Sequence, residues 1–231
     1  YLPDSYQVND ARRPIAATVP SRAELELPAR GFVFCCFNNN YKITPEIFGI
    51  WMRLLKQVDG SVLWLLSDNA DAVRNLRLEA EKRDIDATRL VFAPRMAPAE
   101  HLARHRLADL FLDPLPYNAH TTASDALWAG LPVLTCAGST FPGRVAASLL
   151  HAVGMPELIT RDLQGYERRA LQLAGDPVAL ELLRSKLAQN RDTCALFDTR
   201  RFCRHIEAAY TTMWQRHREG KPPAGFAVTA L

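Results

Sequence analysis

The chain contains 231 residues, of which 48% are hydrophobic. This length and composition are typical of one globular α/β domain with a substantial core, and they leave little room for a second full domain. The 28 Lys and Arg residues stand against 25 Asp and Glu residues, which gives a formal net charge of +3, and no dense basic run is present. The charge pattern therefore gives no indication of a nucleic-acid-binding protein.

The cysteines and the uncharged stretches indicate the cellular compartment in which the protein is expected. The five cysteines are odd in number and form no CxxC pair, so we expect a reducing compartment, no disulfide framework and no metal site. No secretory signal opens the chain, and the longest uncharged stretch, residues 126–143, is interrupted by Gly and Pro. We therefore expect a soluble cytoplasmic protein without membrane contact. The first residue is Tyr1 rather than Met, which fits a piece of a longer polypeptide.

Three segments differ in their sequence pattern. Residues 1–30 contain four prolines and no sustained periodicity, which predicts an irregular arm or linker. Residues 31–219 alternate between strand and helix patterns and form the predicted globular domain with a C-terminal helical extension. Residues 220–231 are rich in Pro and Gly, and we expect them to form a flexible tail.

Within the globular part, a continuous apolar run at 31–37 indicates a strand that is buried on both faces. Thr44 and Pro45 then supply an N-cap and a first-turn proline for a helix that extends to about residue 58. Further strands are predicted at 61–66, 89–93, 108–113, 132–135 and 157–160, and further helices at 68–83, 98–105, 121–129, 144–153 and 199–219. This alternation favours right-handed crossovers and a doubly wound, Rossmann-like parallel sheet, followed by C-terminal helices.

Ligands of such a sheet bind beyond the carboxyl ends of its strands, so the loops there carry the candidate site. The loop after the first strand, residues 38–42, contains three asparagines and Lys42. The amide of Asn39 can donate hydrogen bonds, and the ammonium group of Lys42 is a good point-charge partner for a phosphate. The alternative interpretation is an Asn-rich turn with a solvated lysine.

The loop after the fourth strand leads into a helix that begins near His120, Thr121 and Thr122. The N–H groups of a first helical turn and the helix dipole together attract anions, and the two hydroxyl groups add donors. Asp125 lies one turn further, where a carboxylate can accept hydrogen bonds from a ribose diol. The alternative interpretation is that Thr121 merely caps the helix and that Asp125 complements its dipole.

The loop after the third strand contains Met96 and leads to a helix with His101 and Arg104. These last two residues are three apart and therefore share a helix face. An imidazole can stack on a nucleobase, and backbone groups around Met96 can contact a base edge. The alternative interpretation is that His101 is an ordinary surface histidine.

The chain has no GxGxxG, P-loop, HExxH or GxSxG motif, which argues against the simple dinucleotide, nucleotide hydrolase, zinc protease and serine hydrolase classes.

Five sequence segments in a fixed order resemble the C-terminal catalytic half of O-GlcNAc transferases and of bacterial homologues that carry tetratricopeptide repeats. The segments are 37–43, 61–66, 107–113, 118–130 and 144–148, and the resemblance extends over residues 31–219. It implies a GT-B architecture, in which two Rossmann-like domains face each other across a cleft and the C-terminal one binds the sugar nucleotide.

The resemblance also implies roles at the diphosphate. Lys42 would hold the diphosphate and offset the charge of the leaving group, which makes it the catalytic candidate of this segment. Thr121 and Thr122 would donate hydrogen bonds to the phosphates, with His120 beside them. The resemblance implies no metal and no other cofactor, and the absence of a DxD-type carboxylate pair agrees with this.

At the nucleoside, the resemblance implies that Asp125 binds the ribose, that His101 stacks near the uracil, and that Arg104 matches a basic position of the uridine pocket. The chain departs from the family pattern at two positions. Asn39 replaces a glutamine that is usual beside the diphosphate, and Pro98 replaces a lysine found near the uracil in animal enzymes. These departures leave the preferred base and sugar open.

The implied reaction of the full enzyme is the transfer of GlcNAc from UDP-GlcNAc to Ser or Thr of a protein acceptor. The acceptor-side domain and the repeats of the family lie upstream of the matching segment, so we expect this segment alone to bind sugar nucleotide but to be inactive. No general base is identified in the segment. The alternatives are a related GT-B enzyme that uses UDP-glucose or GDP-fucose, and a non-catalytic sugar-nucleotide-binding or protein-interaction domain.

Overall fold

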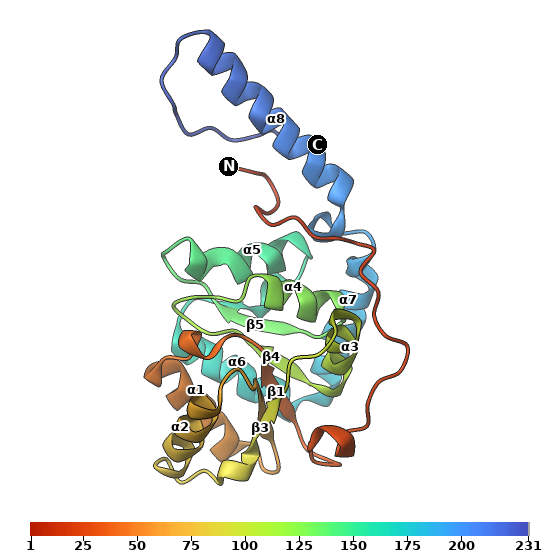
Figure 1. Cartoon of the computed structure of the whole chain (residues 1–231), viewed down its shortest axis with the longest axis vertical. Coiled ribbons are helices and arrows are strands. Elements are labelled where there is room, and N and C mark those ends of the chain that lie inside the picture. The colour runs from red at the N-terminus through yellow and green to blue at the C-terminus, as the bar shows by residue number, and fades with distance from the viewer. Residues whose placement is uncertain (231) are drawn as a thin grey trace.

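The computed structural model describes residues 1–230 and is built around a parallel sheet of six strands in the order β3-β2-β1-β4-β5-β6 (Figure 1). The strands are β1 (Val33–Cys36), β2 (Val62–Leu66), β3 (Leu90–Ala93), β4 (Leu110–Leu112), β5 (Val133–Cys136) and β6 (Ile159–Thr160). All five strand pairs are parallel. The prediction of a doubly wound, Rossmann-like sheet is confirmed, and each predicted strand is present with slightly different ends.

The strand order reverses direction between β1 and β4, which are direct neighbours in the sheet. From β1 the chain proceeds outward through β2 to β3, whereas from β4 it proceeds in the opposite direction through β5 to β6. The loops that follow β1 and β4 therefore lead in opposite directions from this switch point, where open α/β sheets bind their ligands.

Helices cover both faces of the sheet, as the apolar strand sequences require. They are α1 (Pro45–Gln57), α2 (Ala70–Glu81), α3 (Pro98–Arg104), α4 (Thr121–Trp128), α5 (Val145–Ala152), α6 (Leu163–Gly175), α7 (Pro177–Arg191) and α8 (Thr199–Arg218). Figure 1 shows α1 and α2 on one side of the sheet and α3 and α4 on the other. Every residue of β1, β2, β4 and β5 is buried between these layers.

The first helix illustrates how local sequence and packing agree. The Thr44 hydroxyl accepts a hydrogen bond from the Ile47 amide, and Pro45 occupies the first helical position, as predicted. On the buried face, Trp51 is fully enclosed and donates its indole N–H to the Tyr166 hydroxyl of α6 at 3.3 Å. This hydrogen bond satisfies the one polar atom of a large core side chain and fixes α1 against α6.

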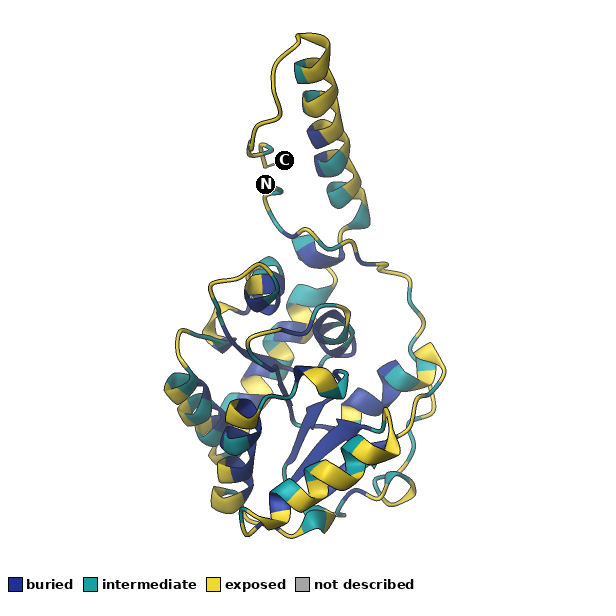
Figure 2. Ribbon diagram, turned by 60° about the vertical axis from the view of Figure 1, so that its left-hand side comes forward, coloured by how far each residue is buried: buried dark blue, intermediate teal, exposed yellow. Residues whose placement is uncertain are grey.

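The two ends of the chain lie close together near α8, which extends away from the sheet (Figures 1 and 2). Residues 1–30 contain no regular element except the 3-10 helix Ala23–Leu25, and they run along the outside of the domain. The segment after α8 turns back, and the Val228 amide donates to the Tyr1 carbonyl at 2.9 Å. Among the helices of residues 1–230, none combines the length and the apolar character that crossing a bilayer requires.

Candidate functional site

Lys42 lies at the switch point and its side chain is turned inward. The 3-10 helix η2 (Asn40–Lys42) follows β1 after the short segment 37–39. The Lys42 ammonium donates to the Asn118 carbonyl at 2.8 Å and lies 4.2 Å from the centre of the Tyr117 ring. Only 9% of the residue is exposed, so the interpretation of a solvated lysine is wrong. Lys42 takes part in none of the ion pairs found within residues 1–230, so no carboxylate neutralises it by direct contact.

Asn38 joins Lys42 to the beginning of α4. The Asn38 Oδ1 atom accepts hydrogen bonds from the Lys42 ammonium at 3.3 Å and from the Thr122 hydroxyl at 2.8 Å. The residue is 2% exposed, so this amide is a fixed part of the structure. Sequence reasoning did not single out Asn38 among the three loop asparagines, although its position directly after a buried strand is a usable signal. The loop after β1 and the beginning of α4 thus meet at the Asn38 side chain.

The beginning of α4 is open to a ligand. The N-cap position is His120, whose side chain makes no capping hydrogen bond, and Thr121 is the first helical residue. The interpretation that Thr121 caps the helix is therefore wrong. Thr121 is exposed, and no side chain caps this first turn. A helix end of this kind attracts an anion.

The His120 ring is held between two aromatic side chains. Its Nδ1 atom shares a hydrogen bond of 2.8 Å with the Tyr6 hydroxyl, and the ring stacks on Tyr117 with 5.3 Å between the ring centres. Burial and the nearby Lys42 lower the pKa of His120, while the Pro142 carbonyl acts in the opposite direction. The imidazole is therefore disposed to remain neutral beside the Lys42 ammonium.

Asp113, at the end of β4, stabilises the loop that leads to α4. Its Oδ1 atom accepts from the Ala119 amide at 2.5 Å, and its Oδ2 atom accepts from the Thr135 hydroxyl at 2.6 Å. Burial raises the pKa of Asp113 to about 7, although these two hydrogen bonds and the positive charge of Lys42 act against the shift. Sequence reasoning identified this carboxylate only as the end of a strand and missed its role in the loop.

Asp125 lies one turn into α4, where the sequence predicts a ribose contact, and it forms an ion pair with Arg13 from the N-terminal arm. Burial raises the pKa of Asp125, and Arg13 lowers it. The sequence predicted that Asp125 belongs to the candidate site but gave no indication of its partner, because Arg13 is more than a hundred residues away in the chain.

The third candidate loop contributes a buried aromatic and cationic cluster. The Phe37 ring meets the His101 ring edge to face at 5.5 Å, and the Arg104 guanidinium lies over Phe37 at 4.4 Å and over Trp64 at 5.9 Å. Arg104 is 1% exposed and donates to the Pro94 carbonyl at 2.7 Å. Arg104 therefore stabilises the loop before α3 from the protein interior and does not present a free donor to a ligand.

His101 belongs to this cluster and is half-buried. Its burial, and to a smaller extent the charge of Arg104, lower its pKa to about 4. Met96 is also half-buried, in the loop between β3 and α3. Asn39 accepts a hydrogen bond of 3.5 Å from Arg95, which is itself paired with Asp68. The loops after β1 and β3 are thus in contact, and the three candidate loops surround one end of the sheet.

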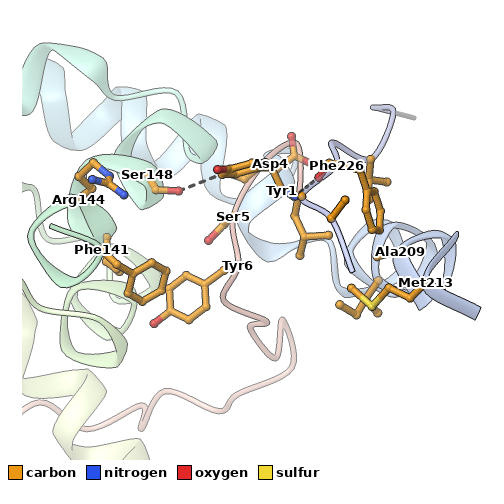
Figure 3. A pocket seen from close by; sticks show the side chains of 16 residues that line it. Tyr1, Asp4, Ser5, Tyr6, Phe141, Arg144, Ser148, Ala209, Met213 and Phe226 are labelled. Atoms are coloured by element: carbon orange, nitrogen blue, oxygen red, sulfur yellow. Dashed lines mark hydrogen bonds between the residues drawn. The ribbon is translucent and has the colours of Figure 1, made fainter. Parts of the chain in front are cut away.

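A cavity of about 570 Å³ lies beside this site, between the N-terminal residues, α5 and α8. Figure 3 shows the Tyr6 and Phe141 side chains next to each other at one end of this cavity, and their rings meet edge to face with 5.0 Å between the ring centres. Because the Tyr6 hydroxyl reaches His120, this tyrosine separates the cavity from the beginning of α4. The arm therefore forms part of the wall around the candidate site.

Known proteins resemble this chain in sequence. Residues 6–206 match glycosyl transferase family 41. The chain is 37% identical over 234 residues to a probable UDP-N-acetylglucosamine–peptide N-acetylglucosaminyltransferase SEC from Arabidopsis thaliana, covering 99% of this chain and 24% of that protein. It is also 37% identical over 209 residues to a UDP-N-acetylglucosamine–peptide N-acetylglucosaminyltransferase from Caenorhabditis elegans, covering 90% and 18%. The chain thus spans a quarter or less of the length of these relatives.

Solved structures give the same assignment. The O-GlcNAc transferase of Thermobaculum terrenum superposes with a TM-score of 0.76 at 32% identity, covering 80% of this chain and 36% of that chain. Anabaena HepE, solved with UDP and glucose, superposes with a TM-score of 0.59 at 16% identity, covering 83% and 51%, which shows a common fold. The chain therefore has the fold of one Rossmann-like half of a GT-B glycosyltransferase. More closely, it belongs to glycosyl transferase family 41.

Proposed function

We propose that this chain is the sugar-nucleotide-binding half of a protein O-GlcNAc transferase. In the full-length enzyme it would take part in the transfer of GlcNAc from UDP-GlcNAc to Ser or Thr of proteins. The family and the names of the two relatives support this activity. The observation that carries the proposal is the convergence of the Lys42 ammonium and the Thr122 hydroxyl on Asn38, beside the uncapped beginning of α4.

The diphosphate would lie over this convergence. Lys42 supplies a full positive charge, and Thr121, Thr122 and the first-turn amides supply neutral donors. In the reaction the bond from the sugar to the diphosphate breaks, and negative charge increases on the departing UDP. Lys42 and the helix end are placed to stabilise that charge, and Asn39 and His120 border the same space.

The nucleoside would extend from the diphosphate along α4 and toward α3. Asp125 would accept hydrogen bonds from the ribose hydroxyls. His101 offers an aromatic face for the uracil, and the backbone around Met96 offers groups for its edge. Arg104 would act indirectly, by holding the Pro94 carbonyl and with it the loop that contains Met96.

Three further features belong to the same proposal. The donor site uses no metal or other cofactor, since Lys42 and α4 provide the positive charge. The partners are the acceptor-side domain and tetratricopeptide repeats of the full-length enzyme, together with a protein acceptor. The chain acts in the cytoplasm, which its five free cysteines support.

Calorimetric titration of this chain with UDP, GDP, UDP-GlcNAc, UDP-glucose and GDP-fucose tests the proposal. We expect UDP and UDP-GlcNAc to bind, and Lys42→Ala to weaken UDP binding roughly 10- to 100-fold, as the loss of one charge-assisted hydrogen-bond donor implies. Lys56→Ala, which removes an exposed lysine of α1, is the matched control. Binding of the GDP ligands alone, or an unchanged affinity of the Lys42 variant, would refute the assignment.

A further inference from the structure

The N-terminal arm contacts the beginning of α4 at several points along its length. Tyr6 contacts His120 at the beginning of the helix, and the Asn9 side chain accepts a hydrogen bond from the Ser124 hydroxyl one turn further. Arg13 then reaches Asp125. The arm thus lies beside the helix whose first two turns carry the candidate phosphate and ribose contacts.

The Arg13 side chain is fixed before any ligand arrives. Its NH1 group donates to Asp125 Oδ1, and its Nε group donates to the Asp10 carbonyl at 3.3 Å. Its backbone carbonyl accepts from the Trp128 indole at 3.2 Å, and its guanidinium lies 6.0 Å from the centre of that indole ring. Both partners of the ion pair are partly shielded, with 24% of the Arg13 side chain and 15% of the Asp125 side chain exposed.

We propose that Arg13 is a positioning residue of the sugar-nucleotide site. It keeps the Asp125 carboxylate ionised and oriented so that it can accept hydrogen bonds from the ribose hydroxyls. The proposal rests on the function proposed above. Arg13 engages Oδ1 of the carboxylate and leaves Oδ2 for a second donor. The Asp10 carbonyl holds the Arg13 guanidinium, so its bond to Oδ1 anchors one oxygen of the carboxylate, and its positive charge favours the ionised form.

The electrostatics of Asp125 give this role a measurable consequence. Burial raises the pKa of Asp125 and Arg13 opposes the increase, so removal of Arg13 would bring protonation closer to neutral pH. A protonated carboxyl group loses one of its acceptor sites, which a ribose diol needs.

The other titratable and charged groups around this part of α4 do not replace Arg13. His120, at the N-cap of α4, shares a hydrogen bond with Tyr6, and burial and Lys42 lower its pKa. Arg191 of α7 donates to the Trp128 carbonyl at 3.2 Å, and Lys42 is directed at Asn118 and Asn38. Within residues 1–230, Arg13 is the cation that forms an ion pair with Asp125.

The test is titration of the chain with UDP between pH 5.5 and pH 8 for the wild type, Arg13→Gln and Arg13→Lys. Arg12→Gln, which changes the exposed neighbouring arginine, is the matched control. We expect Arg13→Gln to weaken UDP binding about 10-fold at pH 8 and more strongly at pH 5.5, because burial raises the pKa of the unpaired carboxyl and a lower pH favours its protonated form. The titration of UDP itself cancels in the ratio of wild-type to variant affinity.

The charge-conserving variant Arg13→Lys should keep UDP affinity within roughly 3-fold of the wild type and should show no added pH dependence, since a lysine retains the charge though not the planar fork. In the background of Asp125→Asn, Arg13→Gln should have little further effect, because its target is already neutral. Wild-type affinity of Arg13→Gln at every pH would overturn the inference and leave the proposed function intact. Failure of the wild type to bind UDP would instead overturn the proposed function.

A second measurement remains decisive if Arg13→Gln does not fold. The carboxyl carbon of Asp125 and the guanidinium of Arg13 are followed by NMR in the unmodified chain during addition of UDP. We expect the Asp125 carboxyl signal to shift while the Arg13 guanidinium keeps its hydrogen bond. Release of Arg13 on UDP addition would show that the ion pair competes with the ligand, and would overturn the positioning role.

Discussion

Lys42 and Thr122 donate to one oxygen atom, Asn38 Oδ1, from opposite sides of the switch point between β1 and β4. Asn38 lies just after β1, Lys42 ends the turn that follows, and Thr122 lies in the first turn of α4, so this atom joins the two halves of the doubly wound sheet. Because the shared acceptor is a neutral amide, the Lys42 ammonium is held in place without being neutralised. A cation held in this way remains available to a diphosphate.

Replacing this neutral amide by a carboxylate should weaken diphosphate binding. In Asn38→Asp the new carboxylate would pair with Lys42 and repel the phosphates, so we expect UDP affinity to fall at least roughly 10-fold, the scale of one charged hydrogen bond. Calorimetric titration measures this loss. Asn75→Asp on α2, where the asparagine is exposed, controls for the added charge and should leave UDP affinity unchanged. Wild-type affinity of the Asn38 variant would contradict the shared-acceptor arrangement.

The Tyr6 hydroxyl should influence the His120 ring. Tyr6→Phe removes the bond to Nδ1 but keeps the aromatic contact with Phe141, so we expect UDP affinity to fall by about 2- to 10-fold with little change in folding stability. Nitrogen NMR of the imidazole should show a changed distribution of its proton between the two ring nitrogens. Tyr210→Phe, an exposed tyrosine of α8, is the control. An unchanged imidazole spectrum would exclude a role of Tyr6 in orienting His120.

The raised pKa of Asp113 predicts a specific pH dependence of folding stability. Its pKa is about 7 in the folded protein, whereas the ordinary pKa of an aspartate carboxyl is 3.8. Between these values the folded carboxyl retains a proton that the unfolded one has lost, so the folded state binds more protons. The free energy of unfolding contributed by Asp113 therefore decreases as the pH rises from about 4 to about 7.

The variant Asp113→Asn should remove this contribution. Its amide oxygen can still accept from the Ala119 amide, and its NH₂ group can donate to the Thr135 hydroxyl, so the fold should persist. Urea denaturation at several pH values measures the difference in unfolding free energy between wild type and variant. Asp59→Asn, which removes an exposed carboxylate, controls for net charge. A wild-type stability that rises relative to Asp113→Asn across this pH range would show that the sign is wrong.

Arg104 should behave as a core residue that lysine cannot replace. Its planar guanidinium stacks on Phe37 and donates to the Pro94 carbonyl, whereas the ammonium of Arg104→Lys would lose the stacking geometry. We expect the free energy of unfolding to fall by about 1–3 kcal/mol, measured by urea denaturation. Arg106→Lys, two residues further and exposed, should have little effect. Equal stability of the two variants would contradict the buried role of Arg104.

The sequence determined the sheet and its order of elements, because those signals are local. Apolar runs of strand length, the cap at Thr44 and the proline at residue 45 each act within a few residues, and the structure confirms them. The sequence also predicted that Lys42 and the beginning of α4 lie at one candidate site, and in the structure Lys42 and Thr122 share the Asn38 Oδ1 atom. The rule that supports this inference, that loops at the carboxyl ends of parallel strands meet at one edge, needs only the alternation of strands and helices.

Only the tertiary structure decided which partner each polar side chain has. Arg13 and Tyr6 lie in a segment without periodicity, and their contacts with Asp125 and His120 span more than a hundred residues. Likewise, the sequence placed Arg104 on a helix face that could meet a ligand, and only the packing against Phe37 shows that it is enclosed. The physical reason is that hydrophobic periodicity reports how each element faces the core, whereas hydrogen bonds and ion pairs depend on distances that exist only after all elements have packed.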